Sequence, residues 1–226
     1  MIQYQKVNNI NLAYSKHNDG KKTLILLHGN GESGKIFLPL IDNIDFEGTI
    51  YAIDTRGHGN SSFALPYSIL QFADDLYEFI KIKKLNNVSI LGYSDGANIA
   101  MVFASKYNFP LEKLVLISGN IYKNGLKKSF LRIISFMYYA LLPFSFIKKI
   151  SHKKTNITLM LNDIGITIDD LTNINCPTTI FCAKNDLIYQ EHTDLIAKNI
   201  QSSQLIKLED CTHFNILNKK EILDSI

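Results

Sequence analysis

The chain has 226 residues, 46% of them hydrophobic and 20% charged, with a formal net charge of +3. This length suits one globular domain with an ample core. Charges of both signs are scattered along the chain and no basic block stands out, so we do not expect a nucleic-acid-binding stripe. The cysteines Cys176, Cys182 and Cys211 lack C-x-x-C spacing, which argues against structural zinc and for a reducing compartment. We therefore expect a cytoplasmic protein with no nucleic-acid partner.

The chain begins with two alternating stretches around Asn8-Asn9, which predict an opening hairpin. Short, continuous apolar runs then predict strands that are buried on both faces. These strands are expected at Thr23–Leu27, Ile50–Ile53, Val88–Leu91, Leu114–Ser118 and Thr178–Ala183, with an edge strand at Gln204–Leu208. Helices are expected at residues 69–84, 95–107, 189–200 and 214–226. This alternation predicts an α/β fold with a mostly parallel, doubly wound sheet.

Residues 120–172 break the alternation, because they contain aromatic residues interleaved with lysines and no clear buried strand. In a compact domain so long a departure is typical of an inserted lid. We expect a core of residues 1–119 and 173–226 and a helical cap at 120–172. The most membrane-like stretch, residues 133–147, has only fifteen residues and contains Pro143, whereas a spanning helix needs about 20. We expect no stable membrane insertion.

The segment "TLILLHGNGESGKI", residues 23–36, looks like a phosphate-binding P-loop at Gly29, Gly34 and Lys35. Ile36, however, stands where that loop needs a hydroxyl to ligate Mg²⁺. Only 18 residues separate Lys35 from Asp54, which opens a switch-like "DTRG" segment. This spacing is too short for a helix, a switch and a strand pair, so the pattern disfavours nucleotide hydrolysis.

The sequence Gly92-Tyr93-Ser94-Asp95-Gly96 follows an apolar strand and precedes an apolar-periodic helix. This is the context that the G-x-S-x-G nucleophile elbow requires. The turn is tight, so the flanking positions need glycine, and the serine oxygen is placed at a helix N-terminus that favours negative charge. The pattern predicts Ser94 as a nucleophile.

A serine hydroxyl needs a base to remove its proton, and the base is a histidine oriented by a carboxylate. In this architecture the chain order is serine, acid, histidine. Asp186 follows the predicted strand Thr178–Ala183, and His213 follows Gln204–Leu208. The sequence therefore predicts a Ser94–His213–Asp186 triad.

Taken together, these segments resemble the α/β-hydrolase superfamily over almost the whole chain outside residues 120–172. "LLHGNGES" looks like its oxyanion loop, "DTRGHGNS" like its D-x-R-G-x-G-x-S segment, and "GYSDGA" like its elbow. "KNDLI" and "CTHF" look like its acid and histidine segments. The resemblance implies an oxyanion hole formed by the backbone N–H groups of Asp95 and Asn30. It also implies that His28, Arg56 and His58 brace their own loops.

The serine nucleophile points to esterases, thioesterases, lipases, peptidases, C–C bond hydrolases or perhydrolases. Our hypothesis is a serine hydrolase, a carboxylesterase that acts on a small-molecule ester, with no metal or organic cofactor. Thioester, C–C, aminoacyl-ester and peptide hydrolysis use the same triad, and a non-enzymatic receptor could also retain it. Turnover is what separates these alternatives.

The expected substrate-binding residues are Tyr93, Phe136 and Tyr139. Aromatic residues of the cap are expected either to line an apolar slot or only to pack the cap on the core. Asp95 adds a second hypothesis, because some α/β hydrolases that act on amino-acid esters resemble this chain in their Ser-Asp-Gly elbow. There the carboxylate would pair with a substrate ammonium; the alternative is an acid favoured by the helix dipole.

Overall fold

The computed structural model describes all 226 residues, and its central feature is an eight-stranded sheet in the order β1-β2-β4-β3-β5-β6-β7-β8. The pairs β1–β2 and β2–β4 are antiparallel, and every other pair is parallel. The strands are β1 (Ile2–Val7), β2 (Ile10–His17), β3 (Lys22–Leu27), β4 (Gly48–Ile53), β5 (Val88–Tyr93), β6 (Leu111–Ile117), β7 (Thr178–Asn185) and β8 (Ser203–Thr212). The predicted opening hairpin and mostly parallel sheet are confirmed.

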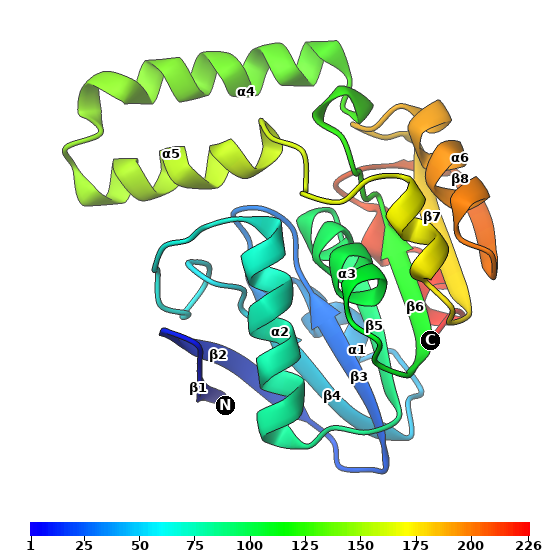
Figure 1. Ribbon diagram of the computed structural model, residues 1–226. Helices are drawn as coiled ribbons and strands as arrows, with labels where there is room; N and C mark the ends of the chain where they lie inside the picture. The colour runs from blue at the N-terminus through cyan, green and yellow to red at the C-terminus, as the bar shows by residue number, and fades with distance from the viewer.

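Helices cover both faces of the sheet (Figure 1), and the predicted helices at 69–84, 95–107 and 189–200 are confirmed as α2, α3 and α6. The α-helices of the core are α1 (Leu38–Ile41), α2 (Ile69–Lys83), α3 (Asp95–Lys106), α6 (Gln190–Asn199) and α7 (Lys220–Leu223). The 3₁₀ helices of the core and its connections are η1 (Gly34–Phe37), η2 (Lys123–Gly125), η4 (Asp169–Asn173) and η5 (Ile216–Asn218). The structure thus has three layers, with the sheet in the middle.

The core has two parts, one on each face of the sheet. One cluster of 33 buried residues includes side chains of α2, α3 and α6, and a second cluster of 16 includes side chains of η1, α1, η5 and α7. Successive residues of β3 contribute to opposite clusters, Ile25 and Leu27 to the first and Leu24 and Leu26 to the second. This two-sided burial explains the continuous apolar runs in the sequence.

Between β6 and β7 the chain forms a hairpin of two helices, α4 (Lys128–Leu141) and α5 (Lys148–Met160), joined through η3 (Leu142–Phe144). We call residues 128–160 the α4–α5 hairpin. It extends beside the sheet at the end where the parallel strands finish (Figure 1). None of the helices combines the length and the hydropathy that a membrane-spanning segment needs.

The prediction of a helix over residues 214–226 is wrong in extent, because this segment contains only η5 and the four-residue α7. The side chain of Asn215 accepts a hydrogen bond of 2.7 Å from the backbone N–H of Thr212. Such an Asn-centred turn competes with helix formation. Ile222 packs into the core, which explains why residues 214–226 show an apolar periodicity although most of them are not helical.

The parallel strands place their carboxyl ends along one edge of the sheet. β3 lies between β4 and β5, with Leu27 paired to Gly92. The segments that follow β3, β5, β7 and β8 therefore meet at this edge, which is where ligands bind in open α/β sheets.

Candidate active site

Ser94 lies between β5 and α3 with backbone angles φ 55° and ψ −119°. Such angles are strained for a residue with a side chain, and strain of this kind clusters at functional sites. A Cβ atom on Gly92 would collide with the carbonyl oxygen of Gly96, and one on Gly96 would collide with that of Leu27. Only glycines on either side allow this turn, which explains the G-x-S-x-G spacing.

His213 lies between Ser94 and Asp186. Its Nε2 atom is 3.1 Å from Ser94 Oγ, and its Nδ1 atom is 2.7 Å from Asp186 Oδ1. Because an ionised carboxylate only accepts hydrogen bonds, Nδ1–H donates to Asp186 and Nε2 is left to accept the serine proton. The structure thus brings together three residues that are 119 and 27 positions apart along the chain.

Asp186 is buried and held by several donors. Burial by itself raises its pKa, but the hydrogen bond and charge of His213, the Ser118 hydroxyl and the backbone N–H of Ala183 outweigh this effect. The pKa of Asp186 therefore lies below its ordinary value, and the carboxylate is ionised at neutral pH.

Sequence reasoning missed Ser118, whose Oγ donates to Asp186 Oδ2. Ser118 directly follows β6, which lies between β5 and β7 in the sheet. The sequence signal for this role is a hydroxyl residue at the end of β6, the strand between the one that precedes Ser94 and the one that precedes Asp186.

A cavity of about 140 Å³ opens beside Ser94. Its lining combines residues of the strand ends with apolar side chains of the segments around them. The lining residues are Gly29, Asn30, Glu32, Tyr93, Ser94, Asp95, Asn120, Leu126, Phe130, Met160, Leu187, Ile188, His213 and Phe214.

Of the three expected substrate-binding residues, only Tyr93 lines this cavity, and its hydroxyl donates to the carbonyl oxygen of His213 at 2.8 Å. The structure does not bring Phe136 and Tyr139 to this cavity, because they are 74% and 67% exposed and lie outside its lining. Phe130 is the α4 aromatic that reaches the cavity. Six residues turn a helix by about 240°, so Phe136 projects away from the direction of Phe130.

Asn30 and Asp95, the two residues predicted to form the oxyanion hole, both line the cavity beside Ser94. The N–H of Asn30 has no acceptor in the protein. Asp95 is the first residue of α3, and the first N–H groups of a helix have no acceptor within that helix. The side-chain amide of Asn30 donates to Asp95 Oδ2 at 2.8 Å and to the carbonyl oxygen of Asn156 in α5 at 2.9 Å. These bonds hold the Asn30 loop next to the start of α3.

His28 holds the other side of this loop. Its Nε2 atom accepts a hydrogen bond from the N–H of Thr55, so Nδ1 carries the proton and donates to the carbonyl oxygen of Gly29. Burial lowers the pKa of His28, which keeps the ring neutral. Arg56 forms a bidentate pair with Asp75. These residues connect loops and lie outside the cavity lining.

Two carboxylates, Asp95 and Glu32, line the cavity and have no ion-pair partner in the protein. Burial raises the pKa of each carboxyl group above its ordinary value. Amide donors hold both, Asn30 and Asn98 for Asp95 and the backbone N–H of Gly29 for Glu32. The cavity therefore holds two carboxyl groups that the protein itself leaves without a cationic partner.

Residues 22–162 match the sequence model of a family described as having the alpha/beta hydrolase fold. An abhydrolase domain-containing protein from Schizosaccharomyces pombe is 41% identical over 81 residues, which are 36% of this chain and 30% of that protein. The human protein named serine hydrolase BPHL is 26% identical over 232 residues, covering 92% of this chain and 78% of that protein.

Among solved structures, a lipase-esterase related protein from Clostridium acetobutylicum superposes with a TM-score of 0.77. It is 26% identical, and the match covers 94% of this chain and 97% of that one. The uncovered 6% of this chain is smaller than the α4–α5 hairpin, so the match includes at least part of that hairpin.

Proposed function

The chain belongs to the α/β-hydrolase fold family, and we propose that it is a serine hydrolase that cleaves a small carboxylic ester through an acyl-enzyme intermediate. One observation carries the proposal: Ser94 Oγ, the imidazole of His213 and the Asp186 carboxylate form a continuous hydrogen-bonded chain of 3.1 and 2.7 Å. A nucleophile within hydrogen-bond reach of a base, which a carboxylate orients, is the arrangement that activates serine.

In the proposed reaction Ser94 Oγ attacks the ester carbonyl carbon while His213 Nε2 takes the hydroxyl proton. The tetrahedral intermediate collapses, the bond to the alkoxy oxygen breaks, and His213 delivers the proton to that oxygen. Water then attacks the acyl-enzyme with His213 again as the base, which releases the acid and restores Ser94. Asp186 stabilises the imidazolium that forms in each half-reaction.

The negative charge of each intermediate develops on the former carbonyl oxygen. We assign its stabilisation to the N–H groups of Asn30 and Asp95. Two preorganised donors of this kind contribute several kcal/mol, since removing one from such a site costs about 3–4 kcal/mol of transition-state stabilisation.

We propose that residues 120–172, which include the α4–α5 hairpin, serve as the cap. Phe130 from α4 and Met160 from α5 both line the cavity beside Ser94. The cavity of about 140 Å³ is close to the size that holds benzene in an engineered core, roughly 150 Å³. A short acyl chain or a single ring therefore fits as the acyl group. The similar protein described as lipase-esterase related supports an ester as the bond cleaved.

A fluorophosphonate probe and a substrate panel test this proposal. The probe should label Ser94, and p-nitrophenyl esters should turn over fastest with short acyl groups, with rates falling for chains that outgrow the cavity. The same acyl groups on a thioester separate ester from thioester specificity. A labelled enzyme that turns over the thioesters and none of the esters would contradict the proposed bond type.

Asp95 favours a second candidate substrate class, esters of amino acids. Its buried carboxylate lines the cavity and receives only amide donors. A substrate ammonium would supply the missing cation. Comparing an aminoacyl ester with its N-acetylated form tests this candidate, since equal kcat/KM values would remove it.

A further inference from the structure

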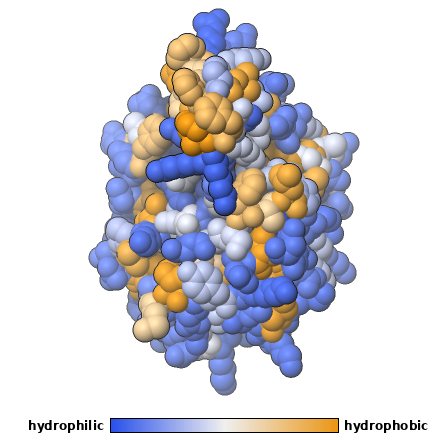
Figure 2. Space-filling model, turned by 90° about the vertical axis from the view of Figure 1, so that its left-hand side faces the viewer, coloured by the Kyte–Doolittle hydropathy of each residue, from blue (hydrophilic) through white to orange (hydrophobic).

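The outer side of the α4–α5 hairpin exposes an unusual number of large apolar side chains. The protein exposes 16 large apolar side chains, and eight of them belong to the 33 residues of the α4–α5 hairpin. They are Ile133, Phe136, Met137, Tyr139, Leu142, Phe144, Phe146 and Ile147. Figure 2, which views the molecule from the side of the helix–helix turn, shows apolar residues gathered at its upper end among hydrophilic ones.

Helix α4 carries apolar side chains on its exposed side as well as on the side that faces the core. Phe130 faces the cavity and Ile134 is buried, whereas Ile133, Phe136 and Met137 lie on the exposed side. In a surface helix the apolar side chains ordinarily face the core, so large apolar side chains on the opposite side call for a second apolar environment. The core covers only one side of α4, so the opposite side is suited to a second apolar environment.

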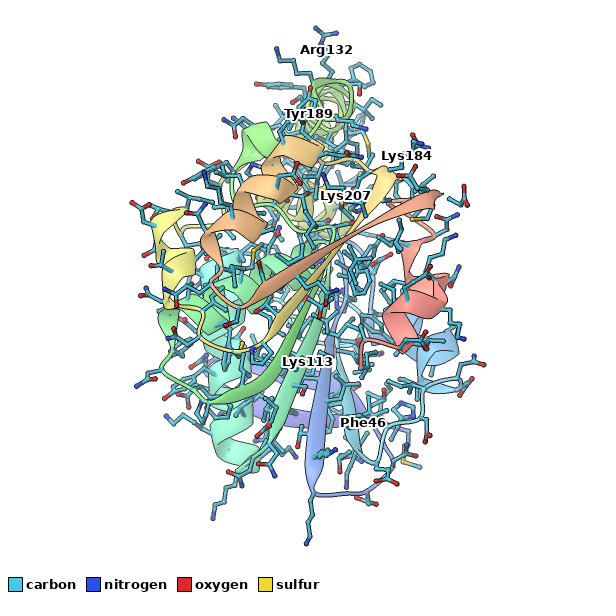
Figure 3. All side chains as sticks on the ribbon, turned by 90° about the vertical axis from the view of Figure 1, so that its right-hand side faces the viewer. Phe46, Lys113, Arg132, Lys184, Tyr189 and Lys207 are labelled. Atoms are coloured by element: carbon cyan, nitrogen blue, oxygen red, sulfur yellow. The ribbon has the colours of Figure 1, made fainter.

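The same hairpin is strongly basic. It contains six basic residues and no acidic one, whereas the rest of the chain has 18 Lys and Arg against 21 Asp and Glu. The six are Lys128, Arg132, Lys148, Lys149, Lys153 and Lys154. None of them forms an ion pair within the protein. Figure 3 shows Arg132 at the top of the molecule, pointing away from the sheet.

We propose that the α4–α5 hairpin docks this protein on the surface of an anionic lipid bilayer. Exposed aromatic residues such as Phe136 and Phe146 enter the boundary between head groups and acyl chains, and the basic side chains contact lipid phosphates. Interfacial binding of this kind scales with buried apolar area and with attraction to anionic lipids. Docking leaves the helices in the plane of the interface, because α4 has only 14 residues.

The charge distribution selects the bilayer over a second copy of this chain. Two copies meeting through this face would each bring six basic residues and no acidic ones, so their charges repel. An anionic lipid surface instead supplies both the apolar layer for the exposed aromatics and the negative charge for the lysines. The proposal is independent of the reaction assigned to Ser94.

Vesicle co-sedimentation of the full chain tests the proposal. Binding to phosphatidylcholine vesicles that contain phosphatidylglycerol should exceed binding to pure phosphatidylcholine about tenfold or more, and it should fall as salt rises. The double variant Lys148→Glu, Lys149→Glu should lose binding to the mixed vesicles. Its matched control is Lys21→Glu, Lys22→Glu, an exposed lysine pair at the start of β3, which should bind like the wild type.

The apolar contribution is tested with Phe136→Ser and Phe146→Ser, which should weaken binding about tenfold, with Tyr4→Ser on β1 as the exposed control. Circular dichroism and thermal unfolding verify that each variant is folded. The proposal is overturned if wild-type binding is absent or equal on the two vesicle types. It is also overturned if Phe136→Ser instead abolishes self-association seen in sedimentation velocity, because the face would then join two copies.

Discussion

The side-chain amide of Asn30 donates a hydrogen bond of 2.9 Å to the backbone carbonyl oxygen of Asn156, and so connects the loop after β3 to helix α5. The same amide donates to Asp95 at 2.8 Å. One side chain thus joins the α4–α5 hairpin, the proposed oxyanion loop and the start of α3. The position of the hairpin and the alignment of the proposed oxyanion hole are therefore coupled.

Replacement of Asn30 by alanine should reveal this coupling. The variant keeps the backbone N–H but loses both side-chain hydrogen bonds, so we expect kcat/KM for a short p-nitrophenyl ester to fall about tenfold, which equals about 1.4 kcal/mol. Asn43→Ala is the matched control, because Asn43 is exposed and bonds only within its own turn. Equal kinetics for the two variants would show that the amide bridge does not position the loop.

Ser118→Ala should change the pH dependence of activity. The Ser118 hydroxyl lowers the pKa of Asp186, so its removal makes the carboxylate a stronger acceptor for the Nδ1–H of His213. The acid limb of the kcat/KM profile, which reports protonation of the catalytic base, should therefore move to higher pH. Ser105→Ala, which removes a hydroxyl bonded to a carbonyl oxygen within α3, should leave the limb in place. An unshifted acid limb in Ser118→Ala would contradict the role of this hydroxyl.

Ser118→Ala should also change how the free energy of unfolding depends on pH. The folded-state pKa of Asp186 is depressed, so its stabilising contribution is present above the unfolded-state pKa and is lost as pH falls through the folded-state pKa. Ser118→Ala should therefore be less stable than the wild type at neutral pH and approach it in acid. Urea unfolding at several pH values measures this difference.

Asp95→Asn keeps the size of the side chain and removes its charge. If Asp95 pairs with a substrate ammonium, kcat/KM for an aminoacyl ester should fall about tenfold or more, while the N-acetylated ester is hardly affected. Because burial raises the pKa of Asp95, the wild-type preference for the free ammonium should strengthen as pH rises through that pKa. Equal losses on both substrates would indicate a structural role instead.

Arg56 and Asp75 form a fully buried pair, which predicts a large effect on stability. Arg56→Met leaves the Asp75 carboxylate buried without its cation and should reduce the free energy of unfolding by about 3–5 kcal/mol. The neighbouring pair Lys106–Asp74 is partly exposed, so Lys106→Met should cost less than about 1 kcal/mol. Urea unfolding of both variants compares them, and similar losses would refute the distinction.

The sheet could be predicted from sequence because each buried strand leaves a continuous apolar run between turn residues. Ser94, Asp186 and His213 could be chosen because each follows such a strand, and parallel strands bring their carboxyl ends to one edge. The exposures of Phe136 and Tyr139 could not be predicted, since α4 is apolar on both sides and its pattern does not reveal which side faces the core. The hydrogen bonds of Ser118 to Asp186 and of Asn30 to Asn156 join segments far apart in the sequence, so local sequence patterns do not predict them.

Hydrolysis of p-nitrophenyl acetate by the wild type and by Ser94→Ala, at matched concentration and with folding verified, tests the proposed mechanism most directly. The geometry around His213 predicts that the variant loses at least about a thousandfold in kcat/KM and no longer reacts with a fluorophosphonate. Retention of full turnover by Ser94→Ala would contradict the assignment of Ser94 as the nucleophile.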